Sequence, residues 1–306
     1  PARGSASCNH LSQKCKRLAG YPTPGDVTGD TILEQTETAF DAASNVIQVT
    51  ARQRYHNATG TGALGDPGSA QPKARVTYAA NWQDGLGRVV AAANYGTNGG
   101  AALSRPATIP ARSDTCLVTS TLYNSAGDVE KITDPLAIVI YMEYDRAGRE
   151  TKKVLNYQGS TGPSTPCAAS DDVGVTINTA YNADGNVATI TAVNSATGNQ
   201  TTTYVYGTTL TDSAVATSTL KRAEVYPDSV DADDRITFKY NRQKEVTELQ
   251  DQNATIHAND YDKLGRKTQD RVTALGTGVD GAVRRIATTF EVRGMMEKIN
   301  SLDNAT

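Results

Sequence analysis

YDRAGR at residues 144–149 and YDKLGR at residues 261–266 are two copies of one pattern: an aromatic residue, Asp, two variable residues, Gly and Arg. YNSAGD at 123–128 and YNADGN at 181–186 follow the same frame with Asn in place of Asp. A short motif that recurs along a chain is typical of repeat folds, in which each copy is one structural unit. The chain has about eight copies, the weaker ones beginning at Phe40, near Trp82, at Tyr240 and at Phe290.

The residue types of the motif favour a tight β-turn. Asp and Asn side chains accept hydrogen bonds from backbone amides two residues ahead, and Gly adopts positive φ at little steric cost. β-branched residues flank the turns, so each copy is predicted to be a strand, a turn and a returning strand. The predicted turn residues are Tyr123, Asn124, Gly127, Tyr144, Asp145, Gly148, Arg149, Tyr181, Asn182, Gly185, Tyr261, Asp262, Gly265 and Arg266.

Two copies lack the glycine of the motif. Ser44 and Lys244 stand in its place. Those two turns must either avoid positive φ or accept a cost of about 1 kcal/mol.

The copies are also spaced as pairs. Tyr123 precedes Tyr144 by 21 residues, and Tyr240 precedes Tyr261 by the same 21. The first member of each pair has Val six positions on, an aliphatic residue nine positions on and Asp eleven positions on, which predicts an internal duplication. In a regular strand the sixth and ninth positions face opposite sides, so either both faces are partly covered or a bulge intervenes.

A single hairpin is only marginally stable in water, so neighbouring hairpins are expected to stack in series. We predict an all-β fold whose stacked β-hairpin repeats form a long coiling sheet, as a partial shell or solenoid. Residues 1–31 are expected to be an irregular N-terminal segment, and residues 32–306 a repeat region truncated at both ends. Segments rich in Gly, Pro, Ser and Thr are predicted to be surface loops at 57–71, 96–113, 159–174 and 208–218.

Composition limits the partners. The 30 basic and 33 acidic residues give a formal net charge of −3, which argues against nucleic acid as a partner. The longest apolar stretch, 135–142, is far shorter than the ~20 residues of a membrane-spanning helix, so no span is expected. The aromatic residues are 14 Tyr against 3 Phe and 1 Trp, which favours sheets with partly hydrated faces.

No catalytic constellation is visible in the sequence. His10, His56 and His257 are far apart, and neither a nucleophile-elbow serine nor a paired-His zinc motif accompanies them. GTGALG at 60–65 and GTGVDG at 276–281 match the dinucleotide-binding glycine spacing, but no strand-to-helix context surrounds them, so loops are favoured. We therefore expect no enzyme, no cofactor and no metal site.

The cysteines and the acidic cluster each have a structural interpretation. Cys8 and Cys15 flank His10 at a spacing that matches no common zinc site, so the pair is the first candidate disulfide to test. Cys116 and Cys167 bring the count to four, for which three pairings exist, and such bonds form outside the cell. The acidic residues between 228 and 234 are expected to form a solvated hairpin tip, since no calcium-loop glycine or glutamate accompanies them.

The repeat arginines have two interpretations. Arg149 and Arg266 could line a surface that binds a polyanion or a sugar. Alternatively, they pair with the repeat aspartates and cover neighbouring tyrosine rings, which is the interpretation we favour.

The recurring Y-D-x-x-G-R pattern resembles the hallmark of Rhs or YD-repeat proteins, and the resemblance covers about residues 32–300. That family includes polymorphic toxins, the B and C components of insecticidal toxin complexes, wall-associated bacterial proteins and the animal teneurins. The resemblance implies that the repeats coil a long sheet into a hollow shell, which in the toxins encloses a C-terminal effector. The core segment that toxin members carry before that domain is not recognisable in this sequence.

These observations favour a secreted or cell-surface, non-catalytic scaffold that encloses or displays another domain, such as a toxin or an adhesion module. Its first partner would be the rest of its own parent chain. A carbohydrate- or cell-surface-binding adhesin is an alternative, because tyrosine rings can stack on surface glycans. A self-assembling extracellular β-filament is another, because a spiral of hairpins has two unpaired edges to which copies of itself can add.

Overall fold

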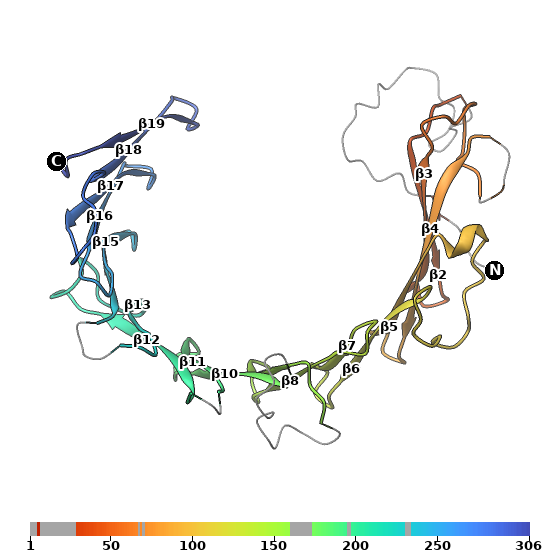
Figure 1. Cartoon of the computed structure of the whole chain (residues 1–306), viewed down its shortest axis with the longest axis horizontal. Coiled ribbons are helices and arrows are strands. Elements are labelled where there is room, and N and C mark those ends of the chain that lie inside the picture. Colours follow the sequence, from red (N-terminus) through yellow and green to blue (C-terminus); the bar gives the residue numbers. More distant parts are fainter. Residues whose placement is uncertain are drawn as a thin grey trace. The chain divides into compact units, whose positions relative to one another are not determined.

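The computed structural model describes the backbone of residues 5–6 and, with side chains, residues 29–66, 68, 71–159, 173–194, 197–229 and 234–306. Within these residues every regular element is a β-strand except the short 3-10 turn η1, Asn98–Gly100 (Figure 1). The chain divides into two compact units, Pro1–Met142 with Leu155–Gln158 as unit 1, and Glu143–Val154 with Gly159–Thr306 as unit 2. The boundary expected between residues 31 and 32 stays a prediction, because most of residues 1–31 lie outside the described part.

Unit 1 is a run of antiparallel strands, drawn from orange to yellow-green in Figure 1. Each strand from β2 to β8 pairs with the next one in the sequence, and the two residues of β1 pair with β2. The bounds are β1 Ser5–Ala6, β2 Glu34–Phe40, β3 Val46–Arg54, β4 Ala74–Gln83, β5 Val89–Gly96, β6 Leu117–Tyr123, β7 Val129–Thr133 and β8 Val139–Tyr144, whose last two residues belong to unit 2.

Unit 2 repeats the same arrangement, from green to blue in Figure 1. Strand β9 pairs with β10, and each strand from β10 to β19 pairs antiparallel with its successor. The predicted fold class, all-β with stacked β-hairpin repeats, is therefore confirmed. The bounds are β9 Glu150–Leu155, whose last residue belongs to unit 1, β10 Val175–Tyr181, β11 Val187–Ala192, β12 Gln200–Thr208, β13 Thr217–Val225, β14 Ile236–Tyr240, β15 Val246–Gln250, β16 Ile256–Tyr261, β17 Lys267–Ala274, β18 Arg285–Phe290 and β19 Met296–Leu302.

A β-bulge follows the repeat turns. Tyr123 is opposite Val129, but Leu122 is opposite Lys131, so residue 130 is an extra residue in its strand. Because of this bulge, Val129 and Ile132 are opposite residues 123 and 121 and lie on the same face of the sheet. Of the two alternatives left by the sequence, the bulge is the one observed. The same shift occurs in the hairpins of Phe40, Gln83, Tyr181, Tyr240, Tyr261 and Phe290.

A compact hydrophobic cluster lies under β4, β5 and β6 of unit 1. The side chain of Trp82 is buried there and donates a hydrogen bond from Nε1 to the Pro106 carbonyl oxygen, at 3.2 Å. The Arg105 guanidinium lies 4.8 Å from the centre of the Trp82 ring, so part of the segment after β5 covers the cluster instead of being only a surface loop. The remaining buried members are mostly small: Ala80, Ala91, Ala93, Cys116 and Val118.

Candidate functional site along the hairpin turns

The repeat motif folds into one defined turn, which residues 145–149 illustrate. The Asp145 amide donates to the Arg149 carbonyl at 2.9 Å, and the Gly148 amide donates to the Asp145 carbonyl at 3.0 Å. The Asp145 Oδ1 atom accepts from the amides of Ala147 and Arg149, at 2.8 and 3.1 Å. Gly148 has φ of 74°, which closes a type I turn with a left-handed residue.

The two backbone hydrogen bonds of this turn occur in all eight copies of the motif. They also occur in two turns without the aromatic residue, which sequence reasoning missed. These begin at Asp134 and Asp251, the aspartates found eleven positions after Tyr123 and Tyr240. The aspartate shared at this position could have indicated the two turns. Ala137 and Ala254 stand where the motif has glycine, so neither turn matched the pattern.

The non-glycine turns adopt the same geometry as the others. Ser44 and Lys244 each have φ of 68°, and Ala137 and Ala254 have φ of 65° and 61°. These turns therefore accept the steric cost of the left-handed region, about 1 kcal/mol each. The hydrogen bonds around the turn hold the conformation although the residue type disfavours it.

Arginine at the fifth turn position pairs with the aspartate of its own turn. Within residues 145–149, Nε and Nη2 of Arg149 lie 2.7 and 2.6 Å from Oδ2 of Asp145. The same pairs form between Arg88 and Asp84 and between Arg266 and Asp262. The guanidinium in each pair holds the pKa of its aspartate below the usual range.

The same arginine also reaches the next hairpin. The Arg149 guanidinium carbon lies 4.3 Å from the centre of the Tyr181 ring. The Tyr181 hydroxyl donates to the carbonyl oxygen of Glu150 at 2.8 Å, next to the arginine in sequence. A Cβ built on Gly185 would lie 3.4 Å from Nη1 of Arg149, an ordinary contact distance, so the guanidinium lies against this turn. We call this unit of Asp, Arg and the following aromatic ring the arginine clamp.

The arginine clamp recurs with small variations. Arg88 lies 4.2 Å from the centre of the Tyr123 ring, and Arg266 lies 4.3 Å from that of Phe290. The Tyr123 and Tyr261 hydroxyls donate to the carbonyls of Val89 and Val246, at 3.1 and 2.8 Å. Each clamp ties one hairpin to its successor by a cation–π contact, and the clamps of Arg88 and Arg149 add a tyrosine hydroxyl hydrogen bond. Tyr261 makes the hydroxyl hydrogen bond without an arginine, since Glu245 occupies the fifth position of the preceding turn.

This geometry agrees with the favoured interpretation of the repeat arginines. Each guanidinium donates hydrogen bonds to its own aspartate and lies over an aromatic ring, so few of its donors remain for a ligand. Within each unit, a clamp therefore connects one hairpin to the next.

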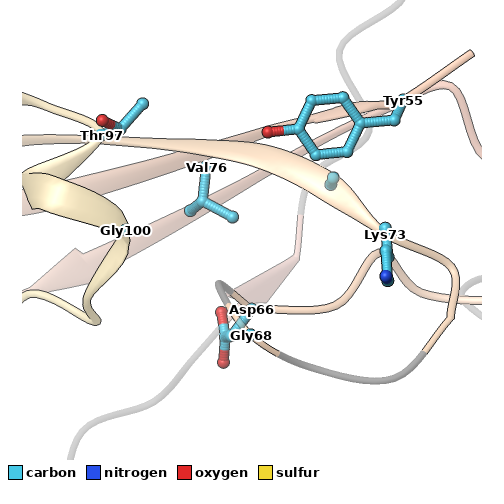
Figure 2. A pocket seen from close by; sticks show the side chains of 8 residues that line it. Tyr55, Asp66, Gly68, Lys73, Val76, Thr97 and Gly100 are labelled. Atoms are coloured by element: carbon cyan, nitrogen blue, oxygen red, sulfur yellow. The ribbon is translucent and has the colours of Figure 1, made fainter.

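A pocket of about 320 Å³ lies in unit 1 near the ends of β3 and β4 (Figure 2). Its wall includes Tyr55, which is 47% exposed, together with Lys73 and Asp66. Asp66 is paired with the buried Arg52, which also lies 3.0 Å from an oxygen of Glu37. Burial disfavours the charged form of Arg52, but hydrogen bonds to both carboxylates outweigh it and raise its pKa. The pocket thus combines an aromatic ring with charged groups.

Most other candidate groups from the sequence lie apart from one another. His257 Nδ1 is 2.8 Å from Oδ1 of Asp270 on the β16–β17 pair, in unit 2. In the part of the chain that the structure describes, no group of three or more His, Cys, Asp or Glu residues could hold a metal ion. No helix of the described residues is long and apolar enough to cross a membrane. The glycine-rich segments 60–65 and 276–281 lie in loops.

The cysteine and acidic-cluster predictions fall largely outside the described residues. Cys8, Cys15 and Cys167 are not among them, so the candidate disulfide between Cys8 and Cys15 stays a prediction. Cys116 is a buried free thiol. Of the acidic cluster, only Asp228 and Asp234 are described.

Comparisons with known proteins find the fold but no close relative. No family model and no curated protein matches the sequence. The chain is similar to the crystal structures of TcdB2-TccC3-Cdc42 and TcdB2-TccC3-TEV, each with a TM-score of 0.50 and 12% identity over 88% of this chain. It spans only 14% and 15% of those chains.

TcdB2-TccC3 is a toxin-complex Rhs-repeat protein. At 12% identity the likeness shows a shared fold and no more. The resemblance predicted from the repeat motif is therefore supported at the level of an Rhs fold, and membership of the YD-repeat family stays a prediction.

Proposed function

We propose that this chain is a non-catalytic structural scaffold, one segment of an Rhs-type β-sheet wall that encloses or displays another domain of its parent protein, outside the cell. The observation that carries the proposal is the arginine clamp, which recurs in both units. A wall built from thin hairpins needs fixed spacing between consecutive strands, and the clamps supply it at the turn edge. The fold shared with part of a toxin-complex Rhs-repeat protein supports the same role.

The packing of the chain also suits a wall. Along β4, buried positions alternate with partly or fully exposed ones, the pattern of a sheet with two different faces. In unit 2 the strands β14 to β17 have mostly half-buried residues, as expected for a thin sheet without a thick core. Such a sheet is stabilised by its neighbours in series and is suited to surround a cargo.

Limited proteolysis of the parent protein tests the proposal. If the sheet encloses another domain, that domain resists protease in the intact protein and becomes sensitive when the paired clamp variant Arg149→Ala/Arg266→Ala loosens the sheet. Arg242→Ala, an exposed arginine in the 241–245 turn, whose fifth position is Glu245 and which has no arginine clamp, is the matched control. An enclosing role is refuted if the second domain is equally sensitive to protease in all three proteins. It is also refuted if that domain is as sensitive in the intact parent as it is when expressed alone.

The pocket beside Tyr55 supports a second candidate, carbohydrate binding. A half-exposed tyrosine ring next to Lys73 and Asp66 offers a stacking surface with polar groups at its edge, the combination that fixes a polar ligand. A glycan array probed with the protein and with Tyr55→Ala tests this. A sugar bound by the parent and lost in the variant supports the candidate, whereas an array without any bound glycan rejects it.

A further inference from the structure

Three motif turns at the C-terminal end of unit 2, which join β14 to β15, β16 to β17 and β18 to β19, form one continuous surface. We define the tip row as residues 241–245, 262–266 and 291–295. A Cβ built on Gly265 would lie 2.5 Å from Oε1 of Glu245, and one built on Gly294 would lie 3.5 Å from Nη1 of Arg266. The three tips are therefore in contact with one another, in chain order.

The tip row is basic although the chain is acidic. It holds five basic and three acidic residues, whereas the whole chain has 30 and 33. Arg242, Lys244 and Lys263 are exposed, and Arg293 has a side chain that is 76% exposed. Asp262 and Glu291 form ion pairs with Arg266 and Arg293, while Glu245 accepts a hydrogen bond from the neutral Asn241 amide and keeps its charge. The three other basic residues, Arg242, Lys244 and Lys263, outnumber it. The exposed charge of the surface is therefore positive.

The same tips present aliphatic side chains to solvent. Leu264 is 78% exposed and Val292 is fully exposed. Each is next to a basic residue, Lys263 and Arg293 respectively. Both stand at the central positions of their turns, beyond the strand ends, so a strand added beside β19 would not cover them. Exposed leucine and valine side chains contribute nothing to the binding of a purely ionic partner, whereas their transfer from water into an apolar environment is favourable.

From this combination we infer that the tip row is a docking surface for an anionic lipid bilayer. The basic side chains would lie at the headgroups, and Leu264 and Val292 would enter the boundary between headgroups and acyl chains. The charge complementarity selects acidic lipids, and the aliphatic side chains select a membrane over a soluble polyanion. This surface is independent of the proposed scaffold role, because it needs only the three turns.

The test is co-sedimentation with vesicles made of equal parts phosphatidylserine and phosphatidylcholine, against vesicles of phosphatidylcholine alone, in about 0.1 M salt. We expect binding to the acidic vesicles only. Lys263→Ala/Arg293→Ala should weaken binding by about 25-fold, since each basic residue near an acidic surface contributes about fivefold. Leu264→Ser/Val292→Ser should weaken it by about tenfold or more.

Leu86→Ser is the matched control, because Leu86 occupies the same turn position as Leu264 and is 80% exposed, but lies in unit 1 outside the tip row. Binding that the control retains and both double variants lose supports the inference. No sedimentation with acidic vesicles overturns it. Binding that survives the aliphatic variant, or that occurs equally on heparin beads, assigns the surface to a polyanion and also overturns it. Unchanged circular dichroism shows that the variants remain folded.

Discussion

Gly265→Ala is the substitution whose effect follows most directly from the geometry of the turn. Gly265 has φ of 77°, where an L-residue costs about 1–2 kcal/mol. The new Cβ would also lie 2.5 Å from Oε1 of Glu245, so that carboxylate must move. Its other oxygen accepts from Nδ2 of Asn241 at 2.6 Å, a hydrogen bond that contributes about 0.5–1.5 kcal/mol. Because this hydrogen bond is only half-buried, we expect a total destabilisation of about 2 kcal/mol.

Two matched substitutions separate backbone strain from the loss of a glycine. Lys244 has φ of 68° in the adjacent turn, so Lys244→Gly should relieve strain and stabilise by a few tenths to about 1 kcal/mol. Gly85 lies in the turn at Trp82 without positive φ and with no atom near its added Cβ, so Gly85→Ala should be close to neutral.

Urea unfolding followed by far-UV circular dichroism measures all three variants against the parent. The free-energy difference comes from the shift of the midpoint at unchanged slope. If Gly265→Ala unfolds at the same urea concentration as the parent, or if Gly85→Ala is equally destabilised, then positive φ is not what the motif glycine provides.

Three further outcomes follow from the pairs described above. A double-mutant cycle with Arg149→Ala and Tyr181→Leu should give a coupling energy of about 0.5–1 kcal/mol, and additive effects in urea unfolding would reject the clamp. Burial raises the pKa of Asp270, but hydrogen bonds from His257 and a neighbouring lysine outweigh it, so the folded pKa lies below 3.8. A lowered folded pKa contributes stability that is full above pH 3.8 and is lost as the pH falls further, so Asp270→Asn should flatten the stability profile there, and an unchanged acid slope would contradict the pair. Arg52→Met should change the unfolding free energy by less than about 1 kcal/mol, because methionine replaces the aliphatic stem and the half-exposed carboxylates of Glu37 and Asp66 regain water. A loss of about 3 kcal/mol in the same assay would show that the charge itself is required.

The hairpins were predictable because their signals are local. An Asx side chain, a glycine three residues later and flanking β-branched residues act within one turn, so the motif at Tyr144 and Tyr261 was enough to place strands on both sides. The turns at Asp134 and Asp251 were not predicted, because alanine occupies the left-handed position in each. The hydrogen bonds and the surrounding sheet keep alanine in that conformation.

Contacts between residues far apart in the sequence were not predictable in this way. The sequence offered two roles for Arg149, and the choice depended on Tyr181, 32 residues away, which only strand pairing brings beneath the guanidinium. The pocket at Tyr55 and the burial of Arg52 likewise depend on residues from separate strands and loops. No periodicity in the sequence indicates that these residues come into contact.

The sequence by itself determined that this chain is an all-β series of hairpins with an Asp-and-Gly turn, since turn and strand preferences act between residues close in the chain. Only the tertiary structure decided where the bulges lie, which ring each arginine covers and which turn tips stand together in a basic, aliphatic row. The physical reason is that register and stacking are set by packing between hairpins, where a shift of one residue reverses the faces of a strand.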